Sequence, residues 1–228
     1  MTVISCRGVS LRYVQPGIPP VTAVNDVNLE IDEGSFVAVE GPSGSGKTTL
    51  LSLLAGLEAP DTGEITVLGH DLSRLTRAER ARLRQRRIGI VFQSFGLLAS
   101  LRAGENVALP LALAGMAERE REARARAALT EVGLDSAFGA RIDELSGGER
   151  QRVGVARALA IGPAVILADE PTGSLDEENA NGVLALLTAA VRRRGASLVL
   201  VTHDPASVAQ ADRHYRMRDG HLTEAVPA

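Results

Sequence analysis

The chain has 228 residues, a composition that is 45% hydrophobic and 23% charged, and a formal net charge of −3. This length predicts one large domain with a substantial buried core, and this charge provides no global basic field of the kind that nucleic-acid-binding proteins use. The single cysteine, Cys6, excludes an intramolecular disulfide and favours a reducing compartment, and no apolar run approaches the 18 residues of a membrane-spanning helix.

The N-terminal segment predicts an antiparallel β layer. Residues 1–7 lack the layout of a signal peptide. Two stretches rich in Val and Ile, 3–8 and 22–31, predict strands, and the Pro- and Gly-rich residues 15–20 predict the turn between them. Tyr13 stands just before this turn, where its ring can either pack on the β layer or stack on an adenine.

Residues 41–48 read Gly-Pro-Ser-Gly-Ser-Gly-Lys-Thr and fit the phosphate-binding pattern G-x-x-x-x-G-K-[ST]. The apolar run 36–40 predicts a buried strand before this loop, and 48–55 predicts the start of a helix after it. Glycines allow the tight turn, and the helix N-terminus favours an anion. The residues expected to bind nucleotide here are Gly41, Ser43, Gly44, Ser45, Gly46, Lys47, Thr48 and Thr49.

Lys47 is the only lysine among 25 basic residues, the others being arginine. The chain therefore has a lysine, with its compact ammonium group on a flexible side chain, only at this position. Lys47 is expected to reach the β- and γ-phosphates, and the Thr48 hydroxyl is expected to ligate Mg²⁺. A structural glycine turn with an exposed lysine is the alternative, but it does not explain why the lone lysine stands here.

The middle of the chain predicts a turn over 57–63, a strand over 64–68 and then a basic helix. Such a helix can bind anionic lipid or nucleic acid, but a solvated helix face is the favoured interpretation. Its seven arginines are Arg74, Arg77, Arg80, Arg82, Arg84, Arg86 and Arg87.

The run 88–92 predicts a buried strand that Gln93 ends. Helices are expected over 101–116 and 117–132, and the second has charge pairs such as Glu120–Arg124 four residues apart. The whole stretch 94–160 predicts an all-α insertion.

Two adjacent carboxylates, Asp169 and Glu170, follow the apolar run 164–168, which is typical of a parallel strand covered on both faces. Asp169 fits an aspartate that holds Mg²⁺ through water, and Glu170 is placed to orient or deprotonate an attacking water. A helix cap is the alternative role. A helix over 177–194 and a strand over 197–202 follow, so the pattern predicts an α/β core with an α subdomain.

A second glycine-rich stretch, Leu145-Ser146-Gly147-Gly148-Glu149, precedes a helix rich in Ala, Val and Leu. It offers another anion site at a helix N-terminus. Within one subunit a second phosphate site has no clear use, whereas between two subunits it can close over the γ-phosphate held by the other P-loop. A simple helix N-cap with flexible glycines is the alternative.

In their order and spacing these motifs resemble the ATP-binding subunits of ABC transporters, over nearly the whole chain. The resemblance implies an α/β fold in which a RecA-like P-loop core and an antiparallel β layer occupy 1–93 and 161–228, and a helical signature subdomain occupies 94–160, within a single domain 1–228. The matching motifs are Walker A at 41–48, the Q-loop Gln93, the signature at 145–149, Walker B with its glutamate at 165–170, the D-loop at 174–176 and the switch histidine His203.

The resemblance also implies residue roles, with ATP and Mg²⁺ as cofactors. Ser146, Gly147 and Gly148 would contact the γ-phosphate of a second copy, and Tyr13 becomes a candidate for stacking on adenine. Glu149 departs from the glutamine usual in the family, a variant that also occurs there. Further site residues are Lys47, Gln93, Glu170 and His203 for catalysis, Asp176 for nucleotide binding, and Thr48, Gln93 and Asp169 for the metal.

Three stretches, 92–98, 104–111 and 168–176, and the segment 217–223 resemble the branch that includes lipoprotein-releasing (LolD), macrolide-exporting (MacB) and cell-division (FtsE) ATPases. This branch implies an ATP-sandwich homodimer, peripheral at the cytoplasmic face of the cell membrane. Because the sequence stops at 228, we expect the membrane permease to be a separate polypeptide. The implied function is to power export or extraction of a hydrophobic, lipid-linked or peptide substrate.

Rival functions of other classes are less well supported. One is an FtsE-like regulatory ATPase whose non-transporting membrane partner controls cell-wall hydrolysis, and it shares the same motifs. A P-loop kinase lacks the 145–149 signature, and a GTPase needs an Asn-Lys-x-Asp motif that a chain with one lysine cannot supply. A DNA-repair ATPase would need a coiled-coil insertion, a zinc cluster or a basic stripe, none of which the sequence contains, so no nucleic-acid partner is expected.

Overall fold

The computed structural model describes residues 1–225, and the chain forms two compact units. Unit 1 comprises Met1–Ala81 together with the chain from Ser197 onward, and unit 2 comprises Arg82–Ala196. Residues 226–228 of the expected segment 161–228 lie outside the described residues. Within the described part, no helix is long and apolar enough to cross a membrane.

The antiparallel β layer of unit 1 confirms the prediction for the N-terminus. Its strand order is β2-β1-β4-β5. Alternate residues of β1 point inward on each side of a register shift between Cys6 and Val9, so that Ile4 and Cys6, and then Val9 and Leu11, are buried. Burial raises the pKa of the Cys6 thiol to about 12. The strands are β1 (Thr2–Gln15), β2 (Ile18–Asp32), β4 (Thr62–Val67) and β5 (His70–Asp71).

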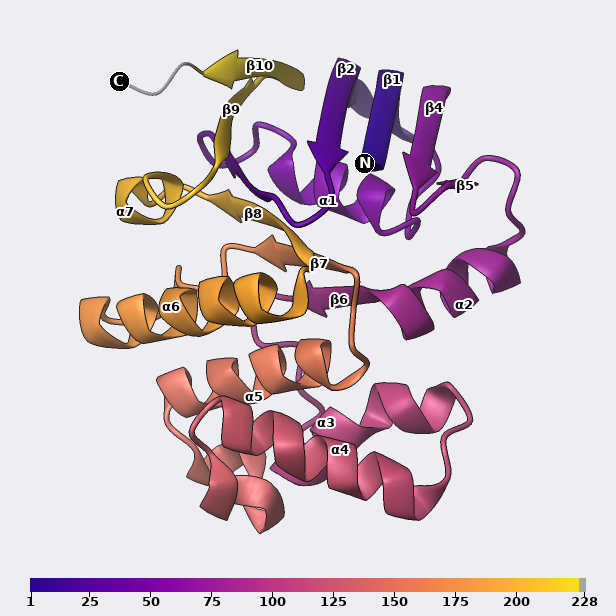
Figure 1. The fold of residues 1–228 in the computed structure, drawn as a ribbon. Coiled ribbons are helices and arrows are strands. Elements are labelled where there is room, and N and C mark those ends of the chain that lie inside the picture. Colours follow the sequence, from indigo (N-terminus) through magenta and orange to yellow (C-terminus); the bar gives the residue numbers. More distant parts are fainter. Residues whose placement is uncertain (226–228) are drawn as a thin grey trace. The chain divides into compact units, whose positions relative to one another are not determined.

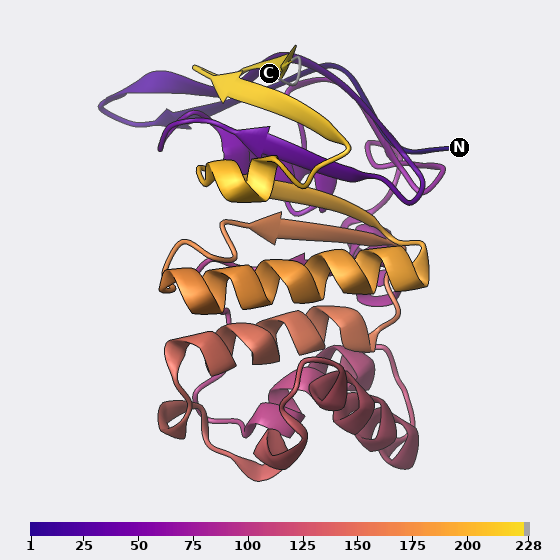
Figure 2. The ribbon, with the colours of Figure 1, turned by 60° about the vertical axis from the view of Figure 1, so that its left-hand side comes forward.

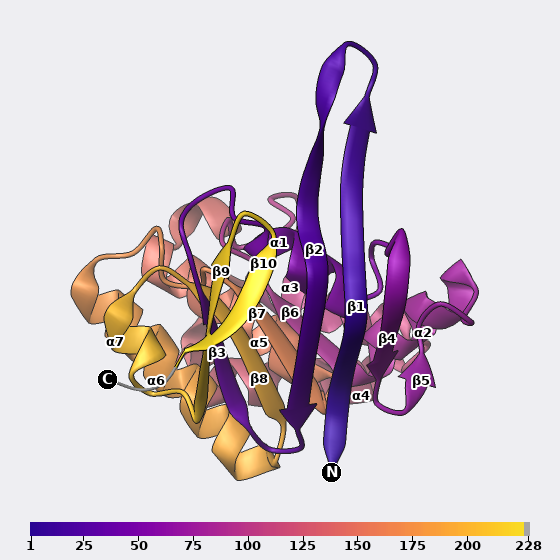
Figure 3. The ribbon, with the colours of Figure 1, turned by 90° about the horizontal axis from the view of Figure 1, so that it is seen from above.

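The β1–β2 hairpin is longer than the sequence predicts. The turn lies within the expected range 15–20 but is shorter, because β1 continues to Gln15 and β2 begins at Ile18, which leaves only residues 16 and 17 between them. Two prolines, Pro19 and Pro20, fit into β2 because it is the edge strand, where a missing N–H costs no ladder bond on the open side. Seen from above, the turn end of this hairpin extends beyond β4 (Figure 3).

A second group of strands in unit 1 holds the P-loop. Strand β3 (Phe36–Glu40) pairs in parallel with β8 (Ser197–Thr202) on one side and with β9 (Arg213–Arg218) on the other. The short helices of this unit are α1 (Lys47–Leu54) and α7 (Pro205–Val208). Strand β10 (His221–Ala225) pairs antiparallel with β9, a hairpin that the sequence analysis did not predict.

Unit 2 contains two parallel strands and four long helices. Strand β6 (Ile88–Val91) pairs in parallel with β7 (Val165–Asp169). Helices α5 and α6 run side by side, with α3 and α4 packed on α5 (Figures 1 and 2). The helices are α3 (Ala103–Leu113), α4 (Glu118–Glu131), α5 (Gly147–Ala160) and α6 (Glu177–Arg194), with short 3-10 turns at Asp135–Gly139 and Ile142–Glu144.

The basic helix α2 (Arg77–Arg87) runs across the division between the units. It contains no buried residue, which supports its interpretation as a solvated helix. On α4 the predicted attraction is present, with Arg124 3.0 Å from Glu120. The named elements between 94 and 160 are all helical, as the sequence predicts for this stretch.

Candidate nucleotide-binding and catalytic site

The P-loop lies between β3 and α1, as the strand–loop–helix pattern predicts. Gly46 is the N-cap of α1, in a left-handed conformation, and no side chain caps this helix. Its first turn also contains no acidic residue. The four N–H groups that open any helix lack partners within the helix, and they favour an anion when no carboxylate stands beside them. The N-terminus of α1 is therefore suited to phosphate.

Lys47 is only 5% exposed, although it carries a charge. Its ammonium group donates to the carbonyl oxygens of Gly41, at 2.8 Å, and Pro42, at 3.0 Å. The Lys47 side chain thus folds back toward the P-loop backbone, and its ammonium group lies against the carbonyl groups of Gly41 and Pro42. Ser45 Oγ is buried nearby without a hydrogen-bond partner among the described residues. These features fit a loop that surrounds a phosphate.

The glycines of the loop serve two separate purposes. A Cβ at Gly46 would lie 1.9 Å from the carbonyl oxygen of Ala23, and a Cβ at Gly41 would lie 2.2 Å from that of Met217. These two glycines allow close backbone packing against β2 and β9. Gly44 instead has φ +78° with open space around its missing Cβ, so it is needed for the turn itself.

Two further predicted residues lie in unit 1. His203 directly follows β8, is exposed, and precedes Asp204, whose side chain caps α7. Hydrogen bonds, chiefly from the Ser207 hydroxyl, hold the pKa of Asp204 below its usual range. Tyr13 lies opposite Val21 in the β1–β2 hairpin and is 42% exposed, so its ring is accessible to a ligand.

The two predicted carboxylates lie at the end of β7, in unit 2. Asp169 is the last residue of this strand. Glu170 has φ +41°, a left-handed conformation that costs a non-glycine residue about 1–3 kcal/mol. Such strain is maintained when surrounding contacts hold the residue, and it is common at functional positions.

Gln93 and Glu170, two residues of the predicted site, contact each other directly. The Gln93 side-chain amide donates to the Glu170 carboxylate at 3.4 Å. The Ser174 hydroxyl, from the predicted D-loop, donates to the Gln93 carbonyl oxygen at 3.4 Å. This juxtaposition follows from the parallel pairing of β6 and β7, which brings their carboxyl ends together.

The signature stretch forms the N-terminus of α5, where Ser146 and Glu149 build a capping box. The Glu149 backbone N–H donates to Ser146 Oγ at 3.2 Å, and the Ser146 N–H donates to the Glu149 carboxylate at 2.8 Å. Hydrogen bonds to the Glu149 carboxylate, first from the Ser146 backbone N–H and then from the Ser146 side chain, lower the pKa of Glu149. The N-cap role left open by the sequence is thus present, and the cap explains why a glutamate is compatible with this position.

The D-loop end of α6 packs against the signature within unit 2. The Asp176 carboxylate accepts from the Asn179 backbone N–H at 2.9 Å and from its side-chain amide at 2.8 Å. A Cβ at Gly148 would lie 2.3 Å from the Asn179 side-chain oxygen. Gly148 is therefore required by this packing. Asn179 was missed by sequence reasoning, although its position three residues after an N-cap aspartate is a signal of a cap contact.

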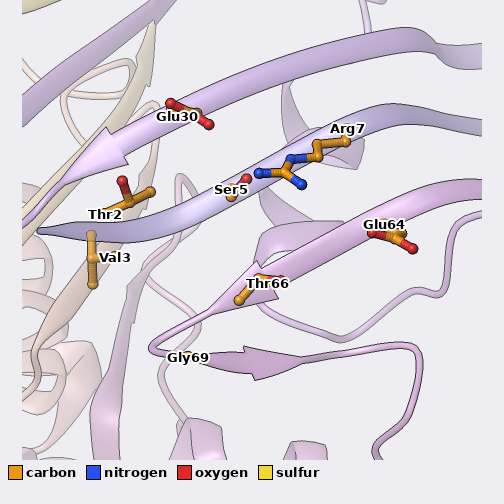
Figure 4. Close-up of a pocket in the computed structure, with 8 residues that line it drawn as sticks. All are labelled: Thr2, Val3, Ser5, Arg7, Glu30, Glu64, Thr66 and Gly69. Carbon is orange, nitrogen blue, oxygen red and sulfur yellow. The ribbon is translucent and has the colours of Figure 1, made fainter.

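A hollow of about 240 Å³ on the polar face of the β layer contains none of the predicted site residues (Figure 4). The Arg7 side chain lies along β1 toward Ser5, with Glu30 on β2 and Glu64 on β4 to either side (Figure 4). Arg7 and Glu64 are partners in the strand register. The mixed charges indicate a solvated sheet face rather than a site of one ligand charge.

The donor set of the predicted metal ligands fits Mg²⁺. Thr48, Gln93 and Asp169 offer a hydroxyl, an amide oxygen and a carboxylate, which are the hard oxygen ligands that this ion prefers. Within residues 1–225 no cluster of three or more His, Cys, Asp or Glu side chains could hold a metal by itself.

Comparison with known proteins identifies a family and several relatives of the chain. A family model described as ABC transporter matches residues 24–173. The lipoprotein-releasing system ATP-binding protein LolD of Chromohalobacter salexigens is 43% identical over 222 residues, which are 97% of this chain and 93% of that protein. The macrolide export ATP-binding/permease protein MacB of Marinobacter nauticus is 47% identical over 204 residues, which are 90% of this chain but 32% of that longer protein.

Solved structures agree with the sequence relatives. The dimeric post-hydrolysis state of the ATP-binding cassette MJ0796, bound to ADP and Pi, has a TM-score of 0.90 and 35% identity, and the match covers 99% of this chain and 100% of that one. A second dimeric structure of MJ0796, a bacterial ABC transporter cassette, gives the same TM-score at 36% identity. The predicted fold is confirmed. The chain belongs to the ABC transporter family, within which it is an ATP-binding cassette.

Proposed function

We propose that the chain is the ATP-hydrolysing subunit of a transporter of the lipoprotein-releasing or macrolide-exporting kind, and that it drives a membrane permease. The observation that carries this proposal is the Gln93–Glu170 contact, a carboxylate held by an amide at the end of a buried strand, in a chain with an intact P-loop. The similarity to LolD and MacB favours transport over the FtsE-like regulatory alternative.

In this proposal the unit 1 residues bind the nucleotide. The P-loop N–H groups and the Lys47 ammonium neutralise the β- and γ-phosphates, and the Tyr13 ring stacks on the adenine. The His203 imidazole contacts the γ-phosphate. Mg²⁺, when bound by Thr48, Gln93 and Asp169, supplies charge neutralisation at the phosphates.

The unit 2 residues carry the hydrolysis step. Gln93 orients a water molecule, and Glu170 accepts its proton as the water oxygen attacks the γ-phosphorus and the bond to the β-phosphate oxygen breaks. We propose that Ser146, Gly147 and Gly148 of a second copy complete the site in a homodimer, a state that the dimeric MJ0796 cassettes illustrate. The Asp176 cap would hold the D-loop at the same interface.

We propose that the permease docks near the Q-loop and that the chain acts at the cytoplasmic face of the membrane through this contact. An apolar hollow of about 190 Å³ in unit 2 supports the docking position. Its lining includes Phe92, Pro110 and Ile161, and Phe92 is 39% exposed. The transported molecule would be hydrophobic, lipid-linked or a peptide, as the relatives' lipoproteins and macrolides suggest.

The substitution Glu170→Gln tests this function. Because the amide cannot accept the water proton, ATP turnover is expected to fall by about 10²–10⁴-fold. ATP binding should persist, and an ATP-dependent dimer should accumulate. Phosphate release, nucleotide titration and light scattering measure the three quantities. Glu118→Gln, on the exposed start of α4, is the control with unchanged activity. Wild-type turnover in Glu170→Gln would refute the assignment.

Transport itself is tested with the permease. Tagged Glu170→Gln protein, isolated from membranes with ATP, is expected to retain an integral membrane partner. The wild-type pair, reconstituted in vesicles, should then move or extract a lipid-linked or hydrophobic substrate only when ATP is hydrolysed. An ATP-dependent change in cell-wall hydrolase activity, without any substrate movement, would favour the regulatory alternative.

A further inference from the structure

Two polar side chains of helix α5 donate hydrogen bonds to backbone carbonyls of the Q-loop, residues 92–96. The buried Gln151 donates from its amide to the Phe92 carbonyl oxygen at 3.3 Å. One turn and a half further along the helix, the Arg157 guanidinium donates to the carbonyl oxygens of Phe95, at 3.1 Å, and Gly96. Both ends of the loop 92–96 are thus bound to the same helix, α5.

The backbone held by these contacts is strained. Phe95 and Gly96 have φ +61° and +60°, so two successive residues are left-handed, one of them a bulky aromatic. A conformation of this kind persists only when its surroundings impose it. A Cβ at Gly96 would lie 2.8 Å from the Phe92 ring and 3.2 Å from the Arg157 guanidinium. The loop is therefore folded tightly against the arginine.

The contacts of Arg157 are unusual for a partly buried cation. The side chain is half-buried, and burial lowers its pKa. Within the described residues it forms no ion pair with a carboxylate, and its acceptors are the two loop carbonyls. The Phe92 ring lies 5.8 Å from its guanidinium carbon. A purely packing role would be filled at lower desolvation cost by an apolar side chain, so the guanidinium is best explained by its hold on the loop.

The same loop carries Gln93, and Gln93 contacts Glu170. Helix α5 begins at the signature, since Ser146 is its N-cap. One helix therefore presents the signature at its first residue and fixes the glutamine loop along its length. The backbone contact is close: a Cβ at Gly154 would lie 3.3 Å from the Phe95 carbonyl oxygen.

We propose that Arg157, assisted by Gln151, is a positioning residue for ATP hydrolysis, which clamps the loop 92–96 to the signature helix and so keeps Gln93 on Glu170. The inference rests on the proposed function, in which Gln93 and Glu170 act on the attacking water. In this proposal, α5 connects the signature rigidly to the Q-loop, so that a movement of either one also moves the other. Nucleotide binding, which unit 1 performs, does not depend on the clamp.

The test is a cycle of Arg157→Met and Gln93→Ala. Removing the guanidinium donors is expected to lower kcat about tenfold and to leave the KM for ATP within about twofold. Gln93→Ala should lower kcat by a similar factor. Because Arg157 acts through Gln93, the double variant should be no slower than Gln93→Ala alone. Arg157→Lys should restore part of kcat, since an ammonium can bind two successive carbonyls, as Lys47 does with Gly41 and Pro42.

Arg194→Met is the matched control. The Arg194 guanidinium also donates to a carbonyl of α5, that of Leu159, at 3.0 Å, and it pairs with Glu131 at 2.6 Å. It lies away from the loop 92–96, so its loss should lower the melting temperature and should change kcat by the same factor with and without Gln93. Gln151→Met, which removes only the Phe92 contact, replaces Arg157→Met in the cycle if the latter does not fold.

The outcomes separate the two proposals. If Gln93→Ala is slow but Arg157→Met is as fast as wild type, or if the losses multiply in the double variant, the clamp is refuted and the proposed function stands. If Gln93→Ala hydrolyses ATP at the wild-type rate, the role of Gln93 in the proposed function is refuted. Non-additive losses with partial rescue by Arg157→Lys support the clamp.

Discussion

The N-termini of α1 and α5 look alike in the sequence and differ in the structure. Each follows glycines and serine, and each was interpreted as an anion site. At α1 the N-cap is Gly46, no side chain caps the helix, and the first turn lacks acids. At α5 the N-cap is Ser146, and Glu149 in the first turn closes a capping box. The N-terminus of α1 thus has no side-chain cap, whereas the N-terminus of α5 is capped by the side chains of Ser146 and Glu149.

This difference agrees with the proposal that one chain supplies half of a hydrolysis site. A carboxylate in the first turn offsets the positive end of the helix, so α5 alone attracts phosphate less than α1 does. The signature is therefore suited to contact a phosphate that another P-loop already holds. Four sets of variants test this comparison.

The largest effect is expected at the glycines of α1. Gly46→Ala would force a Cβ to 1.9 Å from the Ala23 carbonyl oxygen, so we expect a loss of at least about 3 kcal/mol or no folded protein. Gly44→Ala meets only open space and should cost about 1–2 kcal/mol, from its positive φ alone. Denaturant unfolding measures both. Equal losses would show that packing does not distinguish the two glycines.

Weaker ATP binding is expected when the N-terminus of α1 loses the charge of Lys47. Lys47→Ala should weaken ATP binding by about 10–100-fold, the value of a charge-assisted hydrogen bond of about 1.5–3 kcal/mol. Lys47→Arg should not restore it, because a planar fork does not fit a position that is only 5% exposed. Titration with a fluorescent ATP analogue is the measurement. Unchanged affinity in Lys47→Ala would contradict the role of the P-loop.

At the α5 end, stability and turnover should change while binding does not. Ser146→Ala removes the acceptor of the Glu149 N–H and should cost about 0.5–2 kcal/mol. It should also slow hydrolysis while leaving the affinity of the separate chain for ATP unchanged. A parallel drop in affinity at low protein concentration would mean that the signature acts within its own subunit.

The smallest effect is the titration of the α5 cap. The folded-state pKa of Glu149 is lowered, so its stabilisation is present above the ordinary pKa of a glutamate and is lost as the pH falls through the lowered value. Glu149→Gln keeps a side chain that can close the box but does not titrate. The difference in the free energy of unfolding between wild type and Glu149→Gln should be about a few tenths of a kcal/mol near neutral pH and should narrow on acidification. A difference that does not vary with pH would refute the charge contribution.

Much of the fold could be predicted from local patterns. The predicted helix 177–194 and strand 197–202 match α6 and β8 residue for residue, because both have clear periodicity and flanking signals. The turn is shorter than the predicted 15–20 because proline is unfavourable in an average strand, and only the sheet order shows that β2 is an edge strand, which tolerates it. The β9–β10 hairpin was missed because its strands are mostly polar and exposed.

The proposed chemistry of the site rests on sequence patterns that can be recognised without the fold. A glycine loop with the only lysine, two carboxylates after an apolar run, and a glycine-rich signature each identify a task through residue types a few positions apart. Such local signals survive without knowledge of the fold, because they depend on the backbone freedom and charge of neighbouring residues.

The tertiary structure decided which residues support that chemistry. Among 24 arginines nothing in the sequence distinguishes Arg157, which becomes special only because the loop 92–96, some 60 positions earlier, folds onto α5. Likewise, Gly46 and Gly148 are required by Ala23 and Asn179, not by phosphate geometry alone. The physical reason is that the energetic effect of a partly buried charge or of an absent Cβ depends on the atoms around it. Those atoms are distant in the sequence, and only the folded chain brings them into contact.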